Sequence, residues 1–68
     1  MERKIELQIA YAMSRAVAAK SGESYAAWYE VAGKFDDALR ALRAGFVDAA
    51  WRSLKSARRA AAFAESAK

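Results

Sequence analysis

The chain of 68 residues carries a formal net charge of +4 and contains neither cysteine nor histidine. These absences exclude disulfides, thiolate metal sites and any chemistry that uses an imidazole as metal ligand or proton shuttle. We therefore expect no metal ion and no cofactor.

The composition favours α-helix and one small domain. Alanine supplies 19 residues, proline is absent, and Arg, Lys and Glu are abundant. A chain of this length forms one domain at most, so we expect a single all-α domain over residues 1–68. No apolar run approaches the roughly 18 residues that cross a bilayer. Glu6 and Gln8 also interrupt the N-terminal segment that would have to act as a signal peptide. We expect a cytoplasmic protein that does not enter a membrane.

The first expected helix covers residues 3–20 and has apolar residues on two sides. One side carries Ile5, Ile9, Ala12, Met13 and Ala16. The other carries Leu7, Tyr11 and Ala18. Packing within a three-helix monomer needs only one apolar side. The second side is therefore either exposed surface or the interface of a homodimer, and the homodimer is the prediction that we carry forward.

The stretch SGES at residues 21–24 predicts the first turn. Gly22 is expected to take the left-handed conformation that ends a helix, and Ser24 to cap the next one. Trp28, Phe35 and Leu42 then recur seven residues apart, which predicts an amphipathic helix over residues 24–44.

Gly33 would lie on the polar side of that second helix, where glycine weakens it. The alternative is a break at Gly33, with Asp36 and Asp37 in the first turn of a new helix, near the positive end of its dipole.

The third expected helix covers residues 46–66 and follows a turn at Gly45. Three helices of similar length with short connections imply a small antiparallel three-helix bundle, formed by the 24–44/46–66 hairpin and the 3–20 helix. Its centre is expected to contain eight side chains: Trp28, Val31, Phe35, Leu39, Leu42, Val47, Trp51 and Leu54.

The phrase AGKFDDALRAL at residues 32–42 is echoed by AGFVDAAWRSL at residues 44–54. An offset of 12 residues turns a helix by about 120°, so the two copies cannot present the same face. The spacing of glycine and small or apolar residues is similar in both copies to the second half of a tetratricopeptide repeat. The positions that carry this resemblance are Gly33, Phe35, Ala38 and Leu42, and Gly45, Val47, Ala50, Leu54 and Ala57. It implies a protein-binding helical hairpin, although the tryptophan of the full motif is not at the matching distance.

The turn at Gly45 also resembles a helix-turn-helix, with Ala41, Phe46, Trp51 and Leu54 at the buried positions. That resemblance implies binding to nucleic acid. The chain departs from the pattern at Arg40, where the family has an apolar residue, and at Asp48, which would face the DNA.

The basic excess lies entirely at the C-terminal end. Residues 1–48 hold seven basic and seven acidic side chains, whereas residues 49–68 hold five basic ones, including Lys68, against Glu65. On a helical wheel three of these cations share an arc of about 60°, with an aromatic residue beside them and a fourth cation at the edge of the apolar stripe. The expected partner-binding residues are Arg52, Lys55, Arg58, Arg59 and Phe63. The alternative is a solvated basic face that favours the negative end of the helix dipole.

Catalysis is not expected. Three acidic residues are spaced for surface ion pairs at i,i+4, namely Glu30 with Lys34, Asp36 with Arg40, and Asp48 with Arg52. Glu30 and Asp37 share a face but lack the burial that would raise the pKa of a carboxyl, and no glycine-rich phosphate loop is present.

We expect a non-catalytic protein-interaction module, an adaptor or an inhibitor, that presents the basic helix to a protein with an acidic surface. Alternatives are a small nucleic-acid-binding protein that uses the same helix, and a subunit or fragment with a purely structural role.

Overall fold

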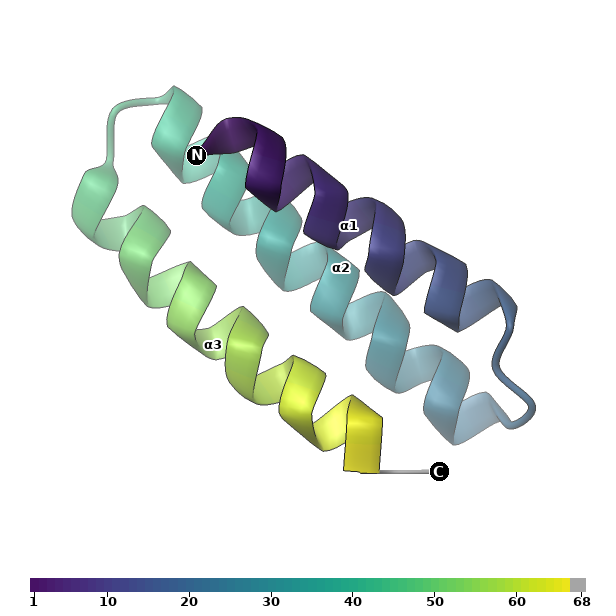
Figure 1. Ribbon diagram of the computed structural model, residues 1–68. Helices are drawn as coiled ribbons and strands as arrows, with labels where there is room; N and C mark the ends of the chain where they lie inside the picture. Colours follow the sequence, from purple (N-terminus) through teal and green to yellow (C-terminus); the bar gives the residue numbers. More distant parts are fainter. Residues whose placement is uncertain (67–68) are drawn as a thin grey trace.

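The computed structural model describes residues 1–66; Ala67 and Lys68 lie outside the described residues. Three helices follow one another: α1 (Glu2–Val17), α2 (Gly22–Arg43) and α3 (Val47–Ser66). α1 and α3 run in the same direction, and α2 runs antiparallel to both (Figure 1). The prediction of a small all-α antiparallel three-helix bundle is confirmed. No strand occurs in residues 1–66.

The turn between α1 and α2 differs from the prediction. α1 ends at Val17 rather than at residue 20, and Ala18 caps it in the right-handed conformation. Ser21 is extended and its Oγ accepts a hydrogen bond from the Ser24 amide at 3.1 Å, so Ser21 rather than Ser24 caps α2. Gly22 is the first residue of α2 and is not left-handed, because the serine cap lies before it rather than after it.

The turn between α2 and α3 lies at Gly45, as predicted. Gly45 has a φ of 85°, the only positive φ in residues 1–66. Its amide donates to the Leu42 carbonyl at 3.1 Å, and the Phe46 amide donates to the Ala41 carbonyl at 2.8 Å. These two bonds form a Schellman motif, which satisfies the last carbonyls of α2 and needs a left-handed residue at this position. α3 therefore begins at Val47, one residue later than predicted.

The core lies along one side of α2 and is only partly the predicted one. Trp28, Val31, Phe35, Leu39 and Leu54 are buried, and Leu42 packs against them half-buried. Val47 and Trp51 were predicted at the centre, but their exposed fractions are 52% and 42%.

Alanines explain this difference. α3 buries Ala50, Ala57, Ala60 and Ala64 around Leu54, and α1 buries Ala12 and Ala16 beside Ile5. On α2, Ala32 and Ala38 are buried as well. Small side chains let two helix backbones approach closely, whereas an indole between α2 and α3 would hold them apart. α3 is therefore rotated so that alanines face α2 and Trp51 lies at the edge of the contact.

α2 is a single helix through Gly33, so the alternative of a break there is wrong. Apart from its chain neighbours and the adjacent backbone of α2, no atom lies within 4 Å of the place that a methyl group on Gly33 would occupy. We therefore predict that Gly33→Ala stabilises the protein by about 1 kcal/mol, because alanine has the higher helix propensity. The free energy of unfolding in urea measures the effect. Gly45→Ala is the matched control and should destabilise by about 1–2 kcal/mol, because alanine disfavours the left-handed conformation. Destabilisation by Gly33→Ala would contradict a continuous α2.

The alanine contact between α2 and α3 gives a second prediction. Ala57 is fully buried, and a leucine there should cost about 1–3 kcal/mol by forcing the two helices apart. Ala62 lies exposed on the same helix, so Ala62→Leu should change the free energy of unfolding by less than about 0.5 kcal/mol. Equal effects of the two substitutions in urea unfolding would mean that Ala57 does not set the helix spacing.

Candidate functional site

The outward side of α3 carries the residues that the sequence singled out. α3 buries its alanines against α2, which turns the opposite side of the helix to solvent. We name five exposed residues the basic face: Arg52, Lys55, Arg59 and Phe63 on that side, and Arg58 at its edge. Phe63 is 68% exposed, so most of its aromatic ring is open to contact. The basic face is therefore available to a binding partner.

None of the four cations of the basic face forms an ion pair or a side-chain hydrogen bond within residues 1–66. The predicted pair of Asp48 with Arg52 does not form. Lys34, predicted to pair with Glu30, instead donates to the Ser56 hydroxyl at 3.0 Å and links α2 to α3. Of the three predicted pairs, only Asp36 with Arg40 is present, with Oδ2 and Nε 3.0 Å apart.

The acidic residues near the N-terminus are used elsewhere. Arg43, at the end of α2, reaches Glu2 at 3.0 Å and Glu6 at 3.3 Å on α1. The hydrogen bond to Glu2 is the largest cause that raises the pKa of the Arg43 guanidinium above its ordinary value; the negative charges of Glu2, Glu6 and Asp36 add to it. The carboxylates of Glu2 and Glu6 therefore pair with Arg43 on α2 and not with the cations of the basic face on α3.

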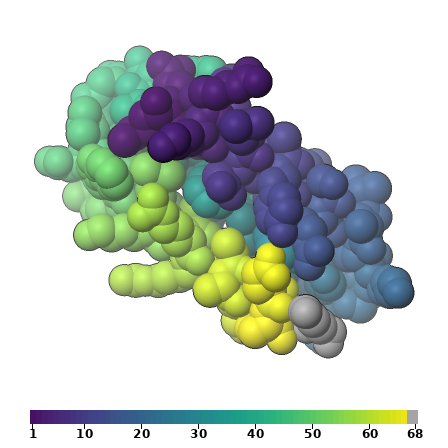
Figure 2. Space-filling view, in the orientation of Figure 1, coloured from purple at the N-terminus to yellow at the C-terminus, as the bar shows by residue number. Residues whose placement is uncertain are grey.

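A groove runs between α1 and α3. Both helices pack along α2, but no Cα of α1 lies within 8 Å of a Cα of α3 in the described chain. The groove between them has a volume of about 410 Å³. In the space-filling view it is the hollow between purple α1 and green α3, with teal α2 at its bottom (Figure 2). We name it the α1–α3 groove.

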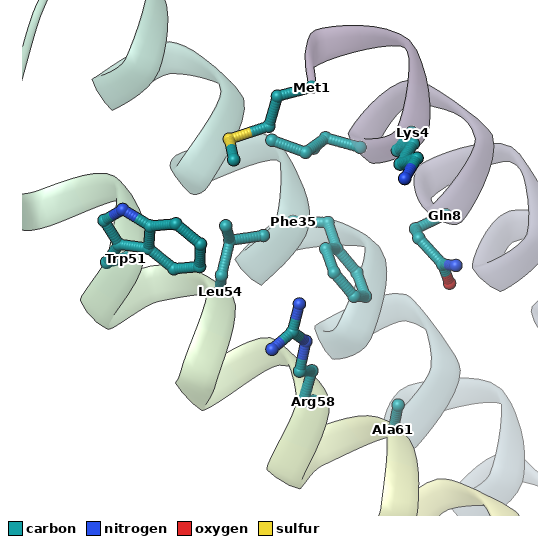
Figure 3. A pocket seen from close by; sticks show the side chains of 9 residues that line it. Met1, Lys4, Gln8, Phe35, Trp51, Leu54, Arg58 and Ala61 are labelled. Carbon is teal, nitrogen blue, oxygen red and sulfur yellow. The ribbon is translucent and has the colours of Figure 1, made fainter. Parts of the chain in front are cut away.

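The α1–α3 groove has an apolar floor and a basic rim. Its floor consists of Ile5, Phe35 and Leu54, one from each helix, and Met1, Trp51 and Ala61 extend the apolar surface. Figure 3 shows Arg58 reaching from α3 toward the Phe35 ring, with Lys4 and Gln8 on the opposite, α1 side. No acidic residue lines the groove.

Sequence reasoning missed this groove. It recognised Arg58 at the edge of the apolar stripe but assigned Trp51 to the core and gave Lys4 and Gln8 no role. One signal was present, because Trp51, Leu54 and Arg58 follow the i, i+3, i+7 spacing of a single helix side. The α1 half of the groove had no comparable signal.

Tyr11 links α1 to both other helices near the far end of the groove. Its ring meets Trp28 edge-on at a centroid distance of 5.8 Å, and its hydroxyl donates to Glu65 at 3.3 Å. The Arg15 guanidinium lies over the Trp28 ring, 5.1 Å from the ring centroid. Tyr11 is still 49% exposed, Leu7 is 54% exposed, and Ala18 is exposed at the end of α1. The three residues predicted for a dimer interface thus lie at the surface, but Tyr11 also has contacts within the chain.

Residues 1–66 contain no group of three or more acidic side chains placed to hold a metal ion. None of the three helices, over the described range, has both the length and the apolar character to span a bilayer. Comparison with known proteins adds no relative, since neither a protein-family model, nor a curated protein, nor a solved structure matches the chain.

Proposed function

We propose that this protein is a non-catalytic interaction module, of adaptor or inhibitor type, that binds an acidic surface of another protein through the basic face. The observation that carries the proposal is that four exposed cations have no internal acidic partner in residues 1–66, although the chain pairs Arg40 and Arg43. Unpaired cations attract an acidic surface from a distance and accelerate encounter with it.

The aromatic residue at the edge of the cations favours a protein as the partner. Phe63 exposes most of its ring beside Arg59. Arginine and aromatic side chains are enriched where proteins meet, and a few such residues carry most of the binding energy. In this proposal Phe63 fills an apolar pocket of the partner while the cations orient the complex.

Nucleic acid is the second candidate, and the exposure of Trp51 favours it. An exposed indole near Arg58 and Lys55 could stack on a base while the cations contact phosphates. Four cations on the basic face neutralise few phosphates, so binding would be weak and strongly dependent on salt.

The two candidates are separated by titration with two defined polyanions, poly-L-glutamate and single-stranded DNA, over a series of salt concentrations. Arg52→Glu/Arg59→Glu should weaken binding of poly-L-glutamate by about tenfold or more, because opposite charge becomes like charge at the contact. Tighter binding of DNA than of poly-L-glutamate at every salt concentration would favour the nucleic-acid candidate.

The matched control is Arg3→Glu/Lys20→Glu. Both double variants lower the formal net charge from +4 to 0, because each substitution removes one positive charge and adds one negative charge. The control residues are exposed outside the basic face, Arg3 near the start of α1 and Lys20 in the turn that follows α1. Equal losses in the two double variants would mean that only net charge matters, which would contradict a specific basic face.

We further propose that the protein is a cytoplasmic homodimer that associates through Leu7, Tyr11 and Ala18. The exposed apolar surface of Leu7 and Tyr11 supports this pairing of α1 helices. Leu7→Glu should then convert the dimer to a monomer, since two charges would meet at a two-fold contact. Light scattering measures the mass; a wild-type mass near the 7.5 kDa of one chain at high micromolar concentration would contradict the dimer.

A further inference from the structure

The α1–α3 groove has the features of a site for a short helix. α1 and α3 both pack on α2, and no Cα of one lies within 8 Å of a Cα of the other, so apart from the Tyr11–Glu65 hydrogen bond at one end the side of the bundle between them is left open in residues 1–66. The groove residues on α3 run from Trp51 to Ala61, which corresponds to about 15 Å along the helix axis. That length accepts side chains at i, i+3 or i+4, and i+7 of a helix, the spacing with which amphipathic helices bind apolar grooves.

Exposed apolar surface continues beyond the groove. Met1 and Trp51 line the groove and are 62% and 42% exposed, and Val47, one turn before Trp51 on the same side of α3, is 52% exposed. Val47 therefore extends the apolar surface past the Trp51 end of the groove. An occupant with the length of a helix is needed to cover this surface together with the groove.

The charges on the rim identify the occupant further. Lys4 lies on one wall and Arg58 on the other, and Gln8 is the remaining polar residue in the lining. Glu2 and Glu6 belong to α1 as well, but their carboxylates are bound to Arg43 and do not line the groove. A helix with apolar residues on one side and Asp or Glu on both flanks complements this rim, because its acids meet Lys4 and Arg58 while its apolar side meets Phe35.

We propose that the α1–α3 groove binds an acidic amphipathic helix of a partner protein, with apolar side chains on Ile5, Phe35 and Leu54 and carboxylates on Lys4 and Arg58. This inference rests on the proposed function in taking the partner to be an acidic protein. It assigns the specific contact to the groove, and leaves to the remainder of the basic face the role of attracting the partner.

The test uses a synthetic, fluorescein-labelled helical peptide of about 16 residues, with leucines spaced four apart on one side and glutamates on the flanks. Fluorescence polarisation should give a Kd on the order of 10–100 µM. Emission from Trp51 should shift to shorter wavelength as unlabelled peptide covers the indole, and Trp51→Phe should abolish that shift. Peptides with Leu→Ala and with Glu→Lys substitutions are the matched controls and should each bind about tenfold more weakly or not at all.

Two protein variants locate the contact. Gln8→Trp places an indole in the groove from the α1 side, and Lys4→Glu/Arg58→Glu reverses the charge of the rim. Each variant should bind the peptide about tenfold more weakly or worse. Arg52→Glu/Arg59→Glu has the same formal charge as the rim variant, but its substitutions lie outside the groove. It should weaken peptide binding by less than about threefold at physiological salt. Circular dichroism and urea unfolding establish that each variant is folded.

The outcomes separate this inference from the proposed function. No binding of the peptide at about 1 mM, or equal weakening by the rim variant and by Arg52→Glu/Arg59→Glu, would overturn the groove as the site. Neither result would affect the binding of poly-L-glutamate to the basic face. Conversely, tight binding of the peptide with no binding of poly-L-glutamate would contradict the proposed function of the basic face and retain the groove.

Discussion

The close packing of alanine-lined helices on α2 is the constraint on which the rest of the structure depends. Ala12 and Ala16 bring α1 against one side of α2, and Ala57 and Ala64 bring α3 against the other. Few large apolar side chains are available, so burial at these contacts relies on close approach of the backbones. This geometry turns Trp51 and Arg58 toward the α1–α3 groove and leaves Phe63 in solvent.

Much of this fold could be predicted because its signals are local. The turn at Gly45 follows from a glycine where an apolar stripe must reverse, and the apolar stripe of α2 follows from Trp28, Phe35 and Leu39 at helical spacing. The rotation of α3 could not be predicted in the same way. Hydropathy places Trp51 in the core, but the size of Ala50 and Ala57 decides which side of α3 fits against α2.

The candidate site could likewise be predicted only in part. Exposure of Arg52, Lys55, Arg59 and Phe63 follows from their positions on one helix, and a wheel places them correctly at the surface. The groove combines Lys4 and Gln8 with Arg58, about 50 residues later in the chain, and its existence depends on the angle between α1 and α3 around α2. The spacing of residues within one helix cannot predict that angle between two helices. The absence of an Asp48–Arg52 pair is likewise a matter of side-chain placement that i,i+4 spacing permits but does not require.

Both outer helices pack on α2 and hardly contact each other, and this arrangement affects how the chain folds. In residues 1–66 no Cα of α1 lies within 8 Å of a Cα of α3, so the close backbone approaches between helices join neighbours along the chain; the bond from Tyr11 to Glu65 joins side chains of the two outer helices. The mean distance along the chain between contacting residues is therefore short. Topologies of this kind have low contact order and belong to the fastest-folding class of small proteins, because little loop entropy is lost before contacts form. Each hairpin can assemble around its own turn, with α2 as the element common to both.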